Sequence, residues 1–195
     1  MGYSLLLDSS NTSLTVGLAK EDTLLDYVSY EAWQCQSEHM IPEINSLLDK
    51  YQLTKNDISF IVVSNGPGSY TGVRIAITIA KVMSTALNIP IYAVSSLHVL
   101  KDDDKPSICL INARSGRSYF GVFKGKEIIE PDQILTNDKV LEYINKHPDY
   151  SICGNTKYID VEGVETNIAK QLLSLKDEKY LVVDTLGLKP VYMKD

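Results

Sequence analysis

The stretch whose residue types and spacing could bind a ligand is Gly66-Pro67-Gly68-Ser69-Tyr70-Thr71-Gly72. An apolar β-branched run at 58–63 precedes it, and apolar residues at helical density follow it, which predicts a strand-to-helix turn. A helix N-terminus offers unpaired N–H groups to a phosphate, and glycine lets a ligand or another backbone approach closely. The spacing matches neither a Walker loop nor the dinucleotide-binding fingerprint. The stretch therefore predicts either a phosphate cradle or a tight turn that only packs a helix against a strand.

Residue types that often carry out acid–base, nucleophilic or metal chemistry are scattered along the chain. The three histidines, His39, His98 and His147, are far apart, and none belongs to a His-Glu-x-x-His pattern. The three cysteines are odd in number and widely spaced, which favours free thiols over disulfides or a metal site. They are Cys35, Cys109 and Cys153. No Gly-x-Ser-x-Gly elbow or Cys-x-x-Cys pair occurs. These residues by themselves predict no metal site, and they leave catalysis open, because catalytic groups can assemble from distant residues.

The elements that must position these residues come in the same order twice. Three strands, a helix, a strand and a helix are predicted in each half, and a short strand closes the first half. The first half has strands at 3–7, 13–19, 24–30, 58–63 and 91–94 and helices at 37–51 and 71–87. The second has strands at 108–111, 119–123, 127–129 and 151–153 and helices at 137–146 and 168–175. A charged break at 101–106 divides them, so we predict domains at 1–101 and 107–195, each with helices layered on a mixed sheet.

The helix predicted at 71–87 has too little polar surface to stand alone. Its larger polar residues, Arg74, Thr78, Lys81 and Thr85, form one narrow stripe, and most of the remaining circumference is apolar. Such a helix needs burial on more than its own sheet. Either the second half of the chain or another subunit is expected to cover it.

Composition limits the classes of function. The chain has 195 residues, 44% of them hydrophobic, which suffices for a packed core. A formal charge of −6 argues against direct and extensive nucleic-acid binding. Its apolar runs are too short for a membrane span, and its N-terminus has no basic region before an apolar one. A cytoplasmic protein is the expectation.

The segment GPGSYTGVRIAITIAK resembles the corresponding segment of the TsaB (YeaZ) family, the partner of the threonylcarbamoyl transferase TsaD in bacterial tRNA modification. Similar residues extend along the whole chain: Asp8-Ser9-Ser10, Ser37-Glu38 with Pro42, Val94-Ser95-Ser96-Leu97 and Pro190-Val191-Tyr192-Met193. The resemblance implies an α/β fold of the actin-like ATPase, Hsp70 and sugar-kinase superfamily. In that fold two ribonuclease-H-like halves face each other, and here the second half is reduced.

The resemblance also implies a function without catalysis. TsaD carries a metal-binding His-x-Glu-Gly-His segment, whereas this chain has Ser96-Leu97-His98-Val99-Leu100, so both ligand positions are lost. In the family, the first helix and the helix after the glycine-rich turn form a bundle with TsaD, and the ATPase TsaE joins the complex. The chain would need no cofactor and would meet tRNA only through that complex. The expected interface residues are Met40, Glu43, Leu47, Arg74, Ile75, Thr78, Ile79 and Val82.

Two alternatives stay open at this point. A nucleotide-dependent enzyme of the same superfamily would use Asp8, Ser9, Gly66 and Gly68, which otherwise are turn-forming residues retained from a nucleotide-binding ancestor. The matching hairpin of the second half has Asn112-Ala113-Arg114 and offers no carboxylate for Mg²⁺. The other alternative is a homodimer that associates through the same two helices.

Overall fold

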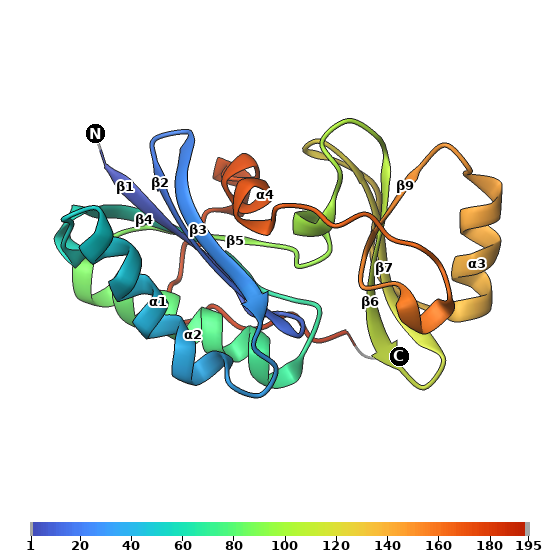
Figure 1. The fold of residues 1–195 in the computed structure, drawn as a ribbon, viewed down its shortest axis with the longest axis horizontal. Coiled ribbons are helices and arrows are strands. Elements are labelled where there is room, and N and C mark those ends of the chain that lie inside the picture. Colours follow the sequence, from blue (N-terminus) through green and yellow to red (C-terminus); the bar gives the residue numbers. More distant parts are fainter. Residues whose placement is uncertain (1, 194–195) are drawn as a thin grey trace.

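A five-stranded sheet forms the first half of the chain in the computed structural model, which describes residues 2–193 (Figure 1). The strands β1 (Tyr3–Asp8), β2 (Ser13–Lys20) and β3 (Thr23–Glu31) make an antiparallel meander. The strands β4 (Ile58–Ser64) and β5 (Ile91–Val94) extend it in parallel, in the order β3-β2-β1-β4-β5. The predicted strands of this half are confirmed.

Two helices cover one face of this sheet, α1 (Gln36–Lys50) and α2 (Tyr70–Leu87). Ser69 caps α2, because its Oγ accepts a hydrogen bond from the Gly72 N–H. Asn88, in the left-handed conformation at φ 52°, ends the helix. Fully buried apolar side chains join helices and sheet, among them Leu5, Leu7, Met40, Val63 and Ala76.

The opposite face of the same sheet is covered by α4 (Ile168–Ser174), from the far end of the sequence. Successive side chains of a strand point to opposite faces, so Leu6 of β1 faces away from Leu5 and Leu7. Leu6 packs with Val62 of β4 and with Ala169 and Leu172 of α4. A sheet with apolar residues on both faces needs a layer on each, and α4 provides the second layer.

The second half contains a four-stranded sheet in the order β8-β7-β6-β9. Its strands are β6 (Ser107–Arg114), β7 (Arg117–Lys124), β8 (Glu127–Thr136) and β9 (Ser151–Gly154), and α3 (Asn137–Lys146) packs on one face. The order repeats that of β3-β2-β1-β4, and within residues 2–193 it has no counterpart of β5. The predicted fold of two related halves, the second reduced, is confirmed.

The strand β8 is longer than the predicted 127–129. It runs for 10 residues and includes Pro131, although proline is usually found at the end of a strand. Because β8 is an edge strand with register shifts against β7, a residue without an N–H group is tolerated there.

After α4 the chain runs back along the first half. The Val182 N–H donates to the Ile91 carbonyl of β5 at 2.9 Å, and the Val191 N–H donates to the Asn65 carbonyl at 2.7 Å. Between them, the Lys81 ammonium of α2 donates to the Leu186 carbonyl at 2.6 Å. The last described segment is thereby fixed along β5 and α2.

The predicted domains, 1–101 and 107–195, are revised by this packing. The sequence places 168–175 in the second half, but α4 and the segment after it pack on the first sheet. We propose that the packing units are 2–101 with 168–193, and 107–165. Residues 1 and 194–195 of the predicted ranges lie outside the described part of the chain.

The role of α4 can be tested with Leu172→Ala. The Leu172 side chain is fully buried against the first sheet, so its truncation should lower the free energy of unfolding by about 2–5 kcal/mol. Urea unfolding measures this, with Val183→Ala at a 98% exposed position as the control, expected within about 0.5 kcal/mol of wild type. Hydrogen exchange should accelerate in β1 and β4; acceleration confined to 107–165 would contradict the assignment of α4.

Candidate functional site

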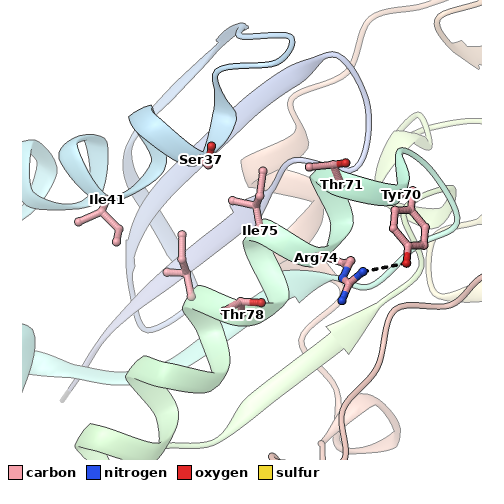
Figure 2. A pocket seen from close by; sticks show the side chains of 8 residues that line it. Ser37, Ile41, Tyr70, Thr71, Arg74, Ile75 and Thr78 are labelled. Carbon is pink, nitrogen blue, oxygen red and sulfur yellow. Dashed lines mark hydrogen bonds between the residues drawn. The ribbon is translucent and has the colours of Figure 1, made fainter.

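A groove between α1 and α2 is the main concave feature on the helical side of the first half. It encloses about 490 Å³. Ile41 from α1 and Ile75 from α2 point into the space between the helices (Figure 2). We call the groove and the neighbouring Val82 the α1–α2 face. The groove is lined by Ser37, Ile41, Tyr70, Thr71, Arg74, Ile75, Thr78 and Ile79.

The α1–α2 face leaves large apolar side chains in contact with water. Ile41 is 52% exposed and Val82 is 63% exposed, while Ile75 and Ile79 are half-buried. The two half-buried isoleucines also contact the core beneath, so the face is an outward extension of the core. Contiguous exposed apolar surface of this kind is typical of a site that another protein covers.

A stack of aromatic and cationic groups closes one end of the groove. The Arg74 guanidinium lies 5.1 Å from the Tyr70 ring centre, and its Nη1 donates to the Tyr70 hydroxyl at 2.8 Å (Figure 2). On its other side Tyr70 stacks on Tyr192, with the ring centres 4.9 Å apart. The end of the described chain thus contributes to the rim of the α1–α2 face.

The structure separates the predicted interface residues into two groups. Met40 is fully buried and Leu47 is 3% exposed in the chain's own core, so neither side chain is available to a partner. This corrects two of the predicted residues. The apolar stripe of α1 is wider than the part of the helix that packs on the sheet. Met40 and Leu47, at the centre of the stripe, face the sheet. The remaining predicted residues, Glu43, Arg74, Ile75, Thr78, Ile79 and Val82, are partly or fully exposed.

The sequence prediction also left out residues of the groove. Ile41, Ser37, Tyr70 and Thr71 line it, but none was predicted as an interface residue. Ile41 follows Met40 directly in the apolar stripe. The signal that could have identified it is that a 15-residue helix on one sheet buries a narrower stripe than this sequence presents.

The glycine-rich turn meets the first hairpin and brings Asp8, Ser9, Gly66 and Gly68 into one region. The Ser9 hydroxyl donates to the Gly72 carbonyl at 2.8 Å, and the Ser69 N–H donates to the Ser10 carbonyl at 2.7 Å. A side chain at Gly68 would overlap the Ser10 carbonyl oxygen. The two segments therefore approach too closely for any residue larger than glycine.

The other contacts of the turn are also made within the chain. Gly66 has φ 109°, and a Cβ there would lie 2.6 Å from the Val191 carbonyl oxygen. The Gly66 N–H donates to the Ser96 hydroxyl at 3.0 Å. The Gly72 N–H donates to Ser69, as described above. The N–H groups that a phosphate cradle would offer at these positions already have partners.

The carboxyl group of Asp8 is surrounded by hydroxyl groups of the same chain. Its Oδ1 accepts from the Ser10 hydroxyl at 2.7 Å and from the Ser64 hydroxyl. Burial raises the pKa of Asp8 above its ordinary value, and the hydrogen bonds from Ser64 and Ser10 oppose that rise. The geometry suits a residue that ties the end of β1 to the end of β4.

His98 joins the two halves of the chain. Its Nε2 is 2.9 Å from the Gly125 carbonyl, and its ring stacks on Phe123 at 4.2 Å between centres. On the other side its Nδ1 is 3.4 Å from the Tyr180 hydroxyl. Burial lowers the pKa of His98 to about 4. This arrangement is that of a neutral packing histidine.

The sequence predicts free, buried thiols, and Cys35 departs from this in its exposure. Cys109 and Cys153 are free and buried, whereas Cys35 is free and only half-buried. Among the described residues, no helix is long and apolar enough to cross a membrane.

The glycine-rich turn can be tested with Gly72→Ala. A Cβ at this position would overlap the Ser9 carbonyl oxygen, so the substitution should lower the free energy of unfolding by at least about 2 kcal/mol. Thr71→Ala, at the exposed neighbouring position, is the control for urea unfolding. If the space around Gly72 were a ligand site with room to spare, Gly72→Ala would be as stable as the control.

His98 predicts a pH dependence of stability. Its pKa is about 4 in the folded chain and near the ordinary 6.5 when unfolded, so the unfolded state binds the proton more readily. The stabilising contribution of neutral His98 is present above pH 6.5 and is lost as the pH falls from 6.5 to 4, by about 3 kcal/mol.

The comparison of wild type with His98→Gln isolates this effect, because buried Asp8 and Asp132, whose pKa values are raised, change stability in the opposite sense. Urea unfolding at several pH values should show the wild type losing about 3 kcal/mol more than the variant between pH 6.5 and 4. Parallel curves for the two proteins would refute the assignment.

Comparison with known proteins gives matches along most of the chain. A family model described as TsaD, tRNA N6-adenosine threonylcarbamoyltransferase, matches residues 30–173. The tRNA threonylcarbamoyladenosine biosynthesis protein TsaB of Bacillus subtilis (strain 168) is 41% identical, over 95% of this chain and 77% of the relative. The protein of the same name from Buchnera aphidicola subsp. Baizongia pistaciae is 34% identical, over 83% of this chain and 80% of the relative.

Solved structures agree on the fold. YeaZ from Pseudomonas aeruginosa superposes with a TM-score of 0.83 at 24% identity, over 99% of this chain and 100% of that one. Three observations lead to one assignment. They are the strand order of the two sheets, the glycine-rich turn packed on the first hairpin, and the identity to relatives along nearly the whole chain. The chain belongs to the TsaB (YeaZ) family.

Proposed function

We propose that this chain acts in the biosynthesis of threonylcarbamoyladenosine in tRNA as a non-catalytic subunit that binds and activates a TsaD-like threonylcarbamoyl transferase. The names of its relatives support the pathway. The observation that carries the mode of action is the α1–α2 face, an apolar surface continuous with the core and left uncovered by the chain. In this proposal the protein is cytoplasmic, a TsaE-like ATPase joins the complex, and tRNA is met only through the transferase.

The physical chemistry of the α1–α2 face suits a helix bundle with a partner. Two adjacent helices leave a groove between them, and a helix pair from another protein can place its side chains in that groove. Ile41 and Val82 are the residues of this face with most apolar surface still to bury. Thr71 and Thr78 are polar residues of the groove lining, and the Arg74 and Tyr70 pair limits it at one end. Arginine and tyrosine are enriched where interfaces gain most of their binding energy.

The proposal that the chain lacks catalytic residues rests on the contacts of the candidate residues. Asp8 binds two serine hydroxyls, and the glycines of the turn pack against the Ser10 and Val191 carbonyls. His98 is buried between the halves. A catalytic group needs to reach a substrate, and each of these side chains or backbone groups is engaged within the fold.

The nucleotide-dependent enzyme is the weaker alternative for the same reason. Its phosphates would have to fit where the first hairpin and the glycine-rich turn touch. The corresponding hairpin of the second half offers the Asn112 amide in place of a carboxylate for Mg²⁺. The Oδ1 of that amide already accepts a hydrogen bond from the Arg114 N–H at 2.8 Å. Isothermal titration with ATP and Mg²⁺ discriminates between the two functions, because an enzyme of this type binds nucleotide by itself.

A homodimer through the α1–α2 face is the other alternative. The same apolar surface would be buried by a second copy, and the geometry of one chain does not favour either partner. Gel filtration of the chain alone and with the TsaD-like protein of the same organism distinguishes them. In our proposal the heterodimer replaces any homodimer, because both use one face.

The partner face can be tested with Ile41→Glu and Val82→Glu. Both side chains are more than half exposed, so a carboxylate there leaves the monomer folded but opposes burial at an interface. Each substitution should weaken binding of the TsaD-like protein by at least about 30-fold, measured by isothermal titration.

Ile128→Glu is the matched control, because Ile128 is a 49% exposed isoleucine on β8 of the second half. It should bind as wild type does. Unchanged binding by both face variants, with their folds intact, would rule out the α1–α2 face as the partner site. If the variants lose self-association while heterodimer formation persists, the face serves the homodimer instead.

A further inference from the structure

The beginning of α1 brings together three side chains that the proposed function does not use. Cys35, Glu38 and His39 each offer one ligand atom, and these atoms lie within 4.8 Å of one another. Among residues 2–193 it is the one group of three possible metal ligands that lie this close together. We propose that Cys35, Glu38 and His39 form a binding site for a single transition-metal dication, with Zn²⁺ as the preferred ion.

The backbone under these side chains is held in place from below. Gln36 is buried, and its side-chain amide donates to the Asn11 carbonyl at 2.9 Å, while Met40 is fully buried in the core. The Glu38 and His39 N–H groups both donate to the Cys35 carbonyl, at 3.0 and 3.3 Å. Gln36 and Met40 thus fix the first turn from the inside, Glu38 and His39 between them are exposed, and Cys35, just before Gln36, is half-buried.

The ligand atoms are not engaged elsewhere in the described chain. Cys35 is the residue that caps α1, yet its side chain makes no capping hydrogen bond. No hydrogen bond or ion pair holds the Glu38 carboxylate, and the His39 ring has only an edge contact with Tyr30, at 6.0 Å between centres. By contrast, Glu43 on the same helix accepts a hydrogen bond from the Tyr30 hydroxyl at 2.8 Å.

The donor set indicates the kind of metal. Thiolate, imidazole and carboxylate are the ligands of zinc, with bond lengths of about 2.0–2.3 Å, which places neighbouring ligand atoms of a tetrahedron about 3.5 Å apart. Solvent-accessible side chains reach that spacing by small rotations from 4.8 Å. Mg²⁺ and Ca²⁺ prefer six or more oxygen ligands, which this site lacks.

Charge favours the same ion. The positive end of the α1 dipole opposes a bare cation at this place. A thiolate and a carboxylate together carry two negative charges, so a dication bound by both adds no net charge at the helix end. Three protein ligands leave the fourth tetrahedral position for water or for a side chain of another molecule. This inference departs from the sequence-based prediction of no metal site and does not depend on the proposed function.

Cobalt(II) is a suitable probe, since it adopts the geometry of zinc and absorbs visible light. Metal-free, full-length protein is titrated with Co²⁺ in the presence of a phosphine reductant. One Co²⁺ per chain should bind, with a thiolate-to-cobalt charge-transfer band and the intense d–d bands of a tetrahedral site. Zn²⁺ should then displace the cobalt and remove both bands, whereas Mg²⁺ should not.

Variants identify the ligands. Cys35→Ser should lose the charge-transfer band, and Glu38→Gln and His39→Gln should each bind Co²⁺ at least about 10-fold more weakly. Glu43→Gln and His147→Gln are the controls, a carboxylate on the same helix and a histidine near the end of α3, and both should behave as wild type. Glu38 and His39 are exposed, Cys35, Glu43 and His147 are half-buried, and circular dichroism checks that all variants remain folded.

Three outcomes would overturn the proposal. Wild type could show no charge-transfer band at any cobalt concentration. The band could survive in Cys35→Ser, which would place the metal on another thiol. One metal per two chains would mean that two copies supply the ligands, and the site within one chain would then be wrong.

Discussion

The close approach of two backbones, the glycine-rich turn and the first hairpin, is the constraint on which the first half depends. The Ser69 N–H and the Ser10 carbonyl join the two segments, and no Cβ fits at Gly68 or Gly72. This contact sets where α2 begins and therefore which of its residues face the sheet and which face water. The same packing contact therefore positions the α1–α2 face and engages backbone groups of the glycine-rich turn within the chain.

The second organising feature is that the first sheet is apolar on both faces, so each face must be covered by other elements. Leu5 and Leu7 are covered by α1 and α2, but Leu6 needs a separate layer. The chain supplies it from α4, after passing through the whole second half, and then runs along β5 and α2 to the glycine-rich turn. The stability of the first half is thereby coupled to residues 168–193. The coupling brings Tyr192 to the rim of the α1–α2 face, where it stacks on Tyr70.

In the proposed function this protein acts through its surfaces. The polar residues Asp8, Ser9 and Ser64, where the first hairpin meets β4 and the glycine-rich turn, bond to one another or to the backbone, and His98 joins the two halves. What stays available to other molecules is the apolar α1–α2 face and, on the outward side of the same first helix, the group of Cys35, Glu38 and His39.

Local sequence patterns determined the elements of this protein. Alternating or continuous apolar runs identified the strands, the glycine-rich turn identified the start of α2, and the repeated order identified two related α/β halves. The resemblance in the turn and helix identified the family, and the identity to TsaB proteins agrees with it. The narrow polar stripe of α2 predicted apolar surface beyond that packed on the sheet, and Val82 is 63% exposed.

Only the tertiary structure decided which residues of each stripe face outward and which distant segments meet. Met40 and Ile41 are adjacent and both apolar, yet one is in the core and the other is half in water. The placement of α4 on the first sheet and the return of the chain to Gly66 depend on contacts over 100 residues or more, which local periodicity does not encode. Likewise, Cys35 and His39 were predicted as isolated residues. They become neighbours of Glu38 because a helix begins between them, and the exact residue at which a helix begins is decided by the contacts that cap it.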